Sequence, residues 1–341
     1  MTELLNTAKA SGLFTSIDYH FAKSVSPNNP QHQLIALLVS HAYGMKHTMI
    51  PYEYLYDSSL WFPNAPHQET LSHIQAFKHQ ANIQSNQDWE KPLAELKAIH
   101  PSPLSLTDFG IYLTKNLVFE HSIVNFLKNH QNNPNDELPQ QSTQKLLHLL
   151  FPIESRLNHQ KIAAANALLS PVSIISGGPG TGKTTTVIKI LLLLLNEHRN
   201  LHISLAAPTG KAAARLNESI EKQKHDFTLK HPELCNLLNK IPNHSTTLHR
   251  LLGINPERLH PKFHAYHTIP TDIIIIDEAS MIDLYIFNLL IEALPKQNIK
   301  VIILGDKDQL SSVEAGAIMA EVCQNIGYNP QRAAQLENIL Q

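Results

Sequence analysis

The chain has 341 residues, of which 43% are hydrophobic, so it is long enough for about two domains with a sizeable core. Charged residues are only 16% and the net charge is −2, which excludes a global basic field for nucleic acid. Any contact with DNA must therefore come from local groups. The apolar runs 190–195 and 273–276 are far too short to cross a bilayer.

The N-terminus lacks the basic-then-apolar pattern of a signal peptide. The two cysteines, Cys235 and Cys323, match no metal motif and suit a reducing compartment. The 21 histidines are scattered, and we interpret them as compositional rather than metal-binding. A soluble, cytoplasmic protein with no membrane association is expected.

Residues 1–128 are predicted to form a mostly helical N-terminal domain. The segment 33–43 has apolar positions at helical spacing and stops at Gly44, residues 111–113 indicate a short strand, and residues 117–127 return to helical periodicity. Residues 129–143 are rich in Asn, Gln and Pro, which is typical of a linker.

Residues 144–341 change to alternating strands and helices. Four apolar strands are predicted at 174–176, 202–206, 272–277 and 300–304, with helices at 183–196, 211–220 and 332–340 and a long polar excursion at 221–246. Strands this uniformly apolar are buried on both faces, as in a parallel sheet flanked by helices. The predicted fold class is therefore α/β, a RecA-like parallel-sheet domain preceded by the helical domain.

A Gly-rich loop between the first strand and its helix fits the pattern G-x-x-x-x-G-K-[ST]. Its glycines let backbone N–H groups approach phosphate oxygens, and the helix dipole points at the same anion. Lys183 would reach the β- and γ-phosphates, and Thr184 would bind Mg²⁺. The alternative is a Gly-rich turn that matches by chance, against which the preceding strand and following helix both argue. The predicted ATP-binding residues of this loop are Gly177, Gly178, Pro179, Gly180, Thr181, Gly182, Lys183, Thr184 and Thr185.

An Asp-Glu pair ends the third strand, where ligands of parallel sheets bind. Asp277 would hold Mg²⁺ and Glu278 would orient and deprotonate the attacking water. The alternative is an acidic strand cap. After the fourth strand, Gln309 can contact the γ-phosphate and sense its loss. Taken alone, its string 305–310 is an ordinary turn, and its place after the other two motifs favours the catalytic role.

Five strings together resemble superfamily 1 DNA helicases. They are SGGPGTGKTTT (176–186), LAAPTGKAAARL (205–216), TTLHRLLG (246–253), IIIIDEASMIDL (273–284) and LGDKDQLSSVEAGA (304–317). Within that group the chain resembles the RecD family, the alpha subunits of exodeoxyribonuclease V (RecBCD), strongly over about 150–330 and more weakly through 36–50 and 110–116. The segment 157–163 resembles the family's adenine-recognising motif, with Gln160 as its glutamine.

The resemblance implies that Pro208, Thr209, Lys211, Thr247 and His249 contact single-stranded DNA. The residues themselves support part of this. Thr209, Lys211 and Arg215 lie around a predicted strand-to-helix turn, where backbone N–H groups, a hydroxyl and cations could contact DNA phosphates. Alternatives stay open: Lys211 and its neighbour Arg215 also suit a solvated helix face, and His249 also suits a satisfied core histidine.

The resemblance further implies a five-prime to three-prime ATP-dependent helicase subunit, working with RecB and RecC on duplex ends in double-strand break repair and recombination. Residues 1–128 would dock onto RecC or, on the plainer alternative, only cover the motor lobe. The family's second RecA-like lobe, with its arginine finger, is not found before residue 341. The isolated chain is therefore expected to bind ATP and hydrolyse it very slowly.

Two other functions stay open at this level. One is a free-standing RecD-like helicase, against which the lack of paired G-x-G hairpins in 1–150 argues. The other is a non-enzymatic half-motor that holds nucleotide or a partner without turnover.

Overall fold

The computed structural model describes residues 2–341 except 64–66, 132–137, 153–156, 199, 256, 258–259, 310–315, 317 and 325–326. The chain divides into two compact units, 1–121 and 122–312 with 317–341. The division falls inside helix α7 (Thr114–Gln131). The predicted linker at 129–143 overlaps residues outside the described ones, so that boundary stays a prediction. No described helix is long and apolar enough to span a membrane.

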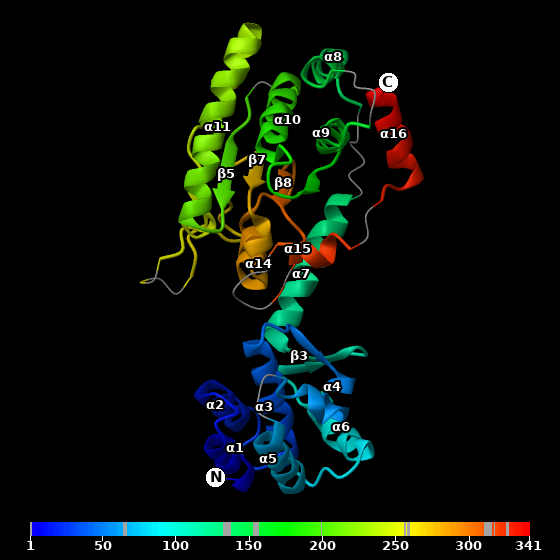
Figure 1. The fold of residues 1–341 in the computed structure, drawn as a ribbon, viewed down its shortest axis with the longest axis vertical. Helices are drawn as coiled ribbons and strands as arrows, with labels where there is room; N and C mark the ends of the chain where they lie inside the picture. Colours follow the sequence, from blue (N-terminus) through cyan, green and yellow to red (C-terminus); the bar gives the residue numbers. More distant parts are fainter. Residues whose placement is uncertain are drawn as a thin grey trace. The chain divides into compact units, whose positions relative to one another are not determined.

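The first unit is mostly helical, with a small antiparallel sheet of order β1-β3-β2 (Figure 1). The strand predicted at 111–113 is its central strand, and the three-residue edge strands carry too few positions to show a period. The elements are α1 (Glu3–Ser11), α2 (Ser16–Val25), α3 (Pro30–Gly44), β1 (Met49–Pro51), α4 (Tyr52–Tyr56), η1 (Ser58–Leu60), α5 (His67–Gln80), η2 (Asn86–Trp89), α6 (Glu90–Ala98), β2 (Leu104–Leu106), β3 (Gly110–Leu113) and the start of α7.

Helix α3 shows how this unit is assembled. The Asn29 side chain accepts from the backbone N–H of Gln31 and His32, and Pro30 occupies the first turn, so the start of the helix is capped. Residues 32–40 are buried throughout, which makes α3 the central helix of the unit. Trp61 and Trp89 meet edge to face in the same core.

The second unit is a five-stranded, all-parallel sheet of order β4-β8-β7-β5-β6 with flanking helices, which confirms the predicted fold class. Its strands are β4 (Val172–Ser176), β5 (Ile203–Ala207), β6 (Thr246–Thr247), β7 (Ile273–Ile276) and β8 (Lys300–Gly305). Its helices are the rest of α7, α8 (Gln141–Leu150), α9 (His159–Leu169), α10 (Lys183–Glu197), α11 (Gly210–Lys230), η3 (Pro232–Leu234), α12 (Cys235–Leu238), α13 (Leu248–Leu252), η4 (Ala279–Met281), α14 (Leu284–Ala293), α15 (Ile318–Val322) and α16 (Pro330–Leu340).

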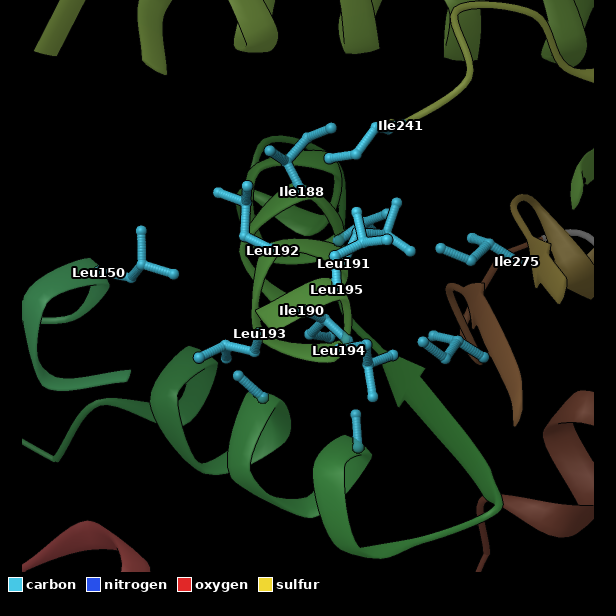
Figure 2. Close-up of a cluster of buried hydrophobic side chains, with 14 of the residues drawn as sticks. Leu150, Ile188, Ile190, Leu191, Leu192, Leu193, Leu194, Leu195, Ile241 and Ile275 are labelled. Carbon is cyan, nitrogen blue, oxygen red and sulfur yellow. The ribbon is translucent and has the colours of Figure 1, made fainter. Parts of the chain in front are cut away.

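Helix α10 lies at the centre of this unit. Its run Leu191–Leu195 is buried on every side, because α8, α9, α11 and α12 all pack against it (Figure 2). A helix that is apolar all round is stable only in such a position. The first turn of α10 carries the Gly-rich loop's lysine, so the deepest part of the core holds the start of the candidate site in place.

Two elements differ from expectation. Helix α11 runs to Lys230, ten residues beyond the predicted end, and covers much of the segment expected as an excursion. Strand β6 was not predicted at all: two threonines make no apolar run, and pairing of Ala206 with Thr246 and Ala207 with Thr247 defines it.

Candidate functional site

The sheet order gathers three predicted segments at one edge. Strand β8 lies between β4 and β7, and all three run parallel. Their carboxyl ends therefore open at the same edge, where ligands of such sheets bind. The Gly-rich loop follows β4, Asp277 and Glu278 follow β7, and residues 306–309 follow β8.

The Gly-rich loop is tied to the sheet and shaped by its glycines. The Gly177 N–H donates to the Gly305 carbonyl at 3.0 Å, extending the β4–β8 pairing into the loop. Gly180 and Gly182 have φ of 76° and 80°, which only glycine adopts freely. The Thr181 hydroxyl donates to the Gly178 carbonyl at 2.8 Å. The backbone is thus preformed as a cradle at the start of α10.

Lys183 is the first residue of α10, and its ammonium lies within the loop. It donates to the carbonyl of Gly178 at 3.2 Å and also to the carbonyl of Gly177. A cation held by carbonyl oxygens at the floor of a phosphate cradle is placed to exchange them for phosphate oxygens. Thr184, next on the helix, is half-buried.

Gln160 contacts the Gly-rich loop directly. It lies in the first turn of α9, which Asn158 caps by accepting from the Lys161 N–H. The Gln160 side-chain amide donates to the Thr181 carbonyl at 2.8 Å. The residue predicted to recognise adenine therefore also joins α9 to the loop.

Asp277 lies at the end of β7, and burial raises the pKa of its carboxyl. Burial is the largest cause. The Glu278 N–H, which donates to this carboxyl at 2.9 Å, lowers the pKa, the Glu278 charge raises it, and the Lys183 charge lowers it. Glu278 has φ of 54°, a left-handed backbone that costs an L-residue about 1–2 kcal/mol. Such outliers cluster at functional positions.

Gln309 and Ser280 link the segments after β8 and β7. The Ser280 hydroxyl donates to the Gln309 side-chain carbonyl at 3.1 Å. Leu310, and most of the string that follows it, lies outside the described residues. Ser280 was not singled out from the sequence: a serine in a loop carries no signal until its partner is known.

The side chains predicted to bind Mg²⁺ are the Thr184 hydroxyl and the Asp277 carboxylate. Both are oxygen ligands of the kind that Mg²⁺ prefers. In the described part of the chain no three His, Cys, Asp or Glu side chains form a metal-binding group. An ion here would therefore take much of its coordination from phosphate and water, as Mg²⁺ does in nucleotide sites.

The predicted DNA-contacting residues lie farther along the same sheet edge. Pro208 to Lys211 follow β5, while Thr247 ends β6, the paired neighbour of β5, and His249 follows it. The Thr209 hydroxyl caps α11 by accepting from the Ala212 N–H at 3.2 Å, and the Thr247 hydroxyl caps α13 by accepting from the Arg250 N–H at 3.3 Å. Two helix N-termini thus open side by side, an arrangement suited to phosphates.

His249 is exposed on α13, so the alternative of a core histidine is wrong. Lys211 and Arg215 are also exposed on α11, which leaves both of their interpretations open. Thr185 differs from its predicted role in one respect. Its hydroxyl donates to the side-chain carbonyl of Gln223 on α11 at 3.0 Å, and Gln223 was not singled out from the sequence.

A parallel sheet whose first strand runs into a glycine-rich phosphate cradle, with an Asp-Glu pair directly after the strand two places along the sheet, defines the P-loop class of nucleotide-binding domains. A family model described as an AAA domain matches residues 160–315. A second, described as the N-terminal domain of the RecBCD enzyme subunit RecD, matches residues 10–112. The chain belongs to the RecD family.

Named relatives agree with that assignment. The RecBCD enzyme subunit RecD of Buchnera aphidicola (subsp. Acyrthosiphon pisum) is 30% identical over 100% of this chain and 55% of its own length. The RecBCD enzyme subunit RecD of Haemophilus influenzae is 33% identical over 98% of this chain and 56% of its own. The ATP-dependent RecD2 DNA helicase of Deinococcus radiodurans is 33% identical over 44% of this chain and 18% of its own. The chain thus spans little more than half the length of the Buchnera and Haemophilus RecD relatives.

Proposed function

We propose that this chain contributes the ATP-binding lobe of a five-prime to three-prime DNA helicase subunit of the RecBCD helicase–nuclease, acting on duplex ends in double-strand break repair and recombination. The observation that carries the proposal is that the residues predicted for both sites follow strands at one edge of the sheet. The phosphate cradle and Asp277 follow β4 and β7, and the two capped helix starts follow β5 and β6. The nucleotide and single-stranded DNA would then bind to adjoining parts of one sheet edge.

In the proposed ATP site each side chain has a distinct task. Lys183 leaves the loop carbonyls to neutralise the β- and γ-phosphates, and Gln160 holds the loop while facing the base. Bound Mg²⁺, held by Thr184 and Asp277, would offset developing charge on the phosphates. Glu278 orients the attacking water and takes its proton. Gln309 contacts the γ-phosphate, and the hydrogen bond from the Ser280 hydroxyl holds the Gln309 side-chain amide in position.

The proposal also includes RecB and RecC as the partners of this chain and the cytoplasm as its location. The match of residues 10–112 to the RecD N-terminal domain supports a partner-docking role for the first unit and the RecBCD type over the free-standing type. Retention of the purified chain on immobilised RecC supports docking. Retention unchanged after residues 1–121 are removed would contradict it.

The test of the ATP site is titration with a fluorescent ATP derivative, with and without Mg²⁺. Lys183→Ala should weaken binding at least about tenfold, which corresponds to about 1.4 kcal/mol, within the range of a charge-assisted contact. Undiminished affinity would make the P-loop assignment wrong. Phosphate release with and without single-stranded DNA then decides between a motor lobe and a binding module without turnover.

A further inference from the structure

Helix α11 carries a polar side chain within its buried stripe. Leu216, Ile220 and Phe227 are buried on one face, and Gln223 falls on the same face at the i+7 position of this series. Gln223 is half-buried and accepts from the Thr185 hydroxyl at 3.0 Å. A polar group in an apolar helix interface is costly unless it is paired, so this hydrogen bond fixes how the two helices meet.

The two ends of this hydrogen bond belong to different parts of the proposed site. Thr185 is in the first turn of α10, two residues after Lys183. Gln223 is in the helix whose first residues, Gly210 and Lys211, follow β5 at the proposed DNA edge, about 20 Å away along the axis at 1.5 Å per residue.

Helix α11 also holds the segment that leads to β6. The Lys224 ammonium donates to the Ile241 carbonyl at 2.7 Å and to the Asn243 side chain. The Ser245 hydroxyl donates to the Ala213 carbonyl at 2.9 Å, and the Ser245 N–H donates to Asn217. Both proposed DNA-contacting segments are therefore attached to one helix, and that helix contacts the first turn of α10.

We propose that Gln223 is a positioning residue that couples single-strand binding at the α11 and α13 starts to the first turn of α10 through its hydrogen bond to Thr185. This inference rests on the proposed function. A shift of α11 on binding single-stranded DNA moves Thr185 and, with it, Lys183 and Thr184. Because coupling between two binding sites is reciprocal, nucleotide binding changes the affinity for single-stranded DNA by the same factor.

The test uses the 341-residue chain, a methylanthraniloyl derivative of ATP and an oligothymidylate. In the unaltered chain, saturating oligothymidylate should change the nucleotide Kd by at least about fivefold. In Gln223→Leu, which suits the apolar stripe, the factor should fall below about twofold, while each ligand alone binds within about threefold of normal. The thermal midpoint should change little, because packing of the leucine in the apolar stripe offsets the lost hydrogen bond. A small change in stability with a lost coupling separates positioning from a merely structural role.

Companion variants sharpen the result. Gln223→Glu keeps the acceptor and should retain the coupling, and Thr228→Leu, at an exposed position of the same helix, should do so too. Thr185→Val removes the same hydrogen bond from the other side, and adding Gln223→Leu to it should cause no further loss of coupling. Coupling that survives Gln223→Leu, or that is absent from an unaltered chain that binds both ligands, overturns the inference. A chain that binds no nucleotide at all instead overturns the proposed function.

Discussion

Gln160 and Gly182 lie in direct contact across the phosphate loop. A Cβ atom at Gly182 would stand 2.7 Å from the Gln160 side-chain nitrogen, and Gly182 itself has φ of 80°. The glycine therefore serves two purposes: it gives the loop its left-handed turn and leaves room for the amide that donates to Thr181.

Gly182→Ala should accordingly weaken nucleotide binding at least about tenfold and lower stability by about 1–3 kcal/mol, because the alanine is strained and displaces the Gln160 amide. Nucleotide titration and urea unfolding measure the two effects. Gly44→Ala is the control, since nothing lies within 4 Å of a Cβ at that position; its stability should change by less than about 0.5 kcal/mol. Normal binding by Gly182→Ala would contradict the role given to this contact.

The backbone conformation of Glu278 is expected to lower the stability of the fold, while its carboxylate serves the proposed reaction. Its left-handed backbone suits glycine, so Glu278→Gly should be about 1 kcal/mol more stable than Glu278→Ala in urea unfolding. Both variants should retain nucleotide binding, because Glu278 is assigned to the attacking water and not to the phosphates. Equal stability of the two variants would mean that the backbone strain is absent in solution.

Asp277 should make stability depend on pH in a direction set by its burial. Because folding raises its pKa, the ionised carboxylate disfavours the fold: no penalty exists below the unfolded pKa of about 4, and it grows as pH rises through the folded pKa. Asp277→Asn should therefore melt higher than the unaltered chain at pH 7, with the gap closing towards pH 4. It should also lose the Mg²⁺ dependence of nucleotide binding.

Asp88 provides the opposite control for that experiment. Backbone N–H groups of Gln84 and Ser85 donate to its exposed carboxylate and lower its pKa. Its stabilising contribution is present above the ordinary carboxyl pKa and is lost as pH falls through the lowered one. Asp88→Asn should thus melt lower than the unaltered chain at pH 7, with that gap also closing in acid. Thermal melts of all three proteins across pH check both signs.

Lys211 should contribute to single-strand binding as a phosphate contact. Lys211→Ala is expected to weaken oligonucleotide binding about equally for all sequences and to reduce the slope of log K against log salt by about 0.7–1. Lys230→Ala, at the exposed far end of the same helix, is the control and should leave the slope unchanged. Fluorescence anisotropy across a salt series gives both values. Equal slopes for the two variants would assign Lys211 to a solvated helix face.

Several elements could be predicted because their signals are local. The isoleucine run of β7 predicts a buried strand, and the leucine run of α10, which places apolar side chains on every side of the helix, predicts a buried helix. Strand β6 could not be predicted, because its two threonines become a strand only by pairing with Ala206 and Ala207. The end of α11 was placed too early for a related reason: beyond Ile220 its buried face continues through a polar residue, Gln223, whose partner is distant in the sequence.

The sequence by itself determined that a glycine-rich loop joins an apolar strand to a helix at Gly177–Thr184, since spacing, turn chemistry and periodicity are properties of neighbouring residues. Only the tertiary structure decided which side chains meet that loop. Gln160 comes from α9 and Gln223 from α11, and Lys183 rests against the loop's own carbonyls. Such pairs depend on how helices pack across the sheet, and packing is set by the shapes of side chains far apart in the chain.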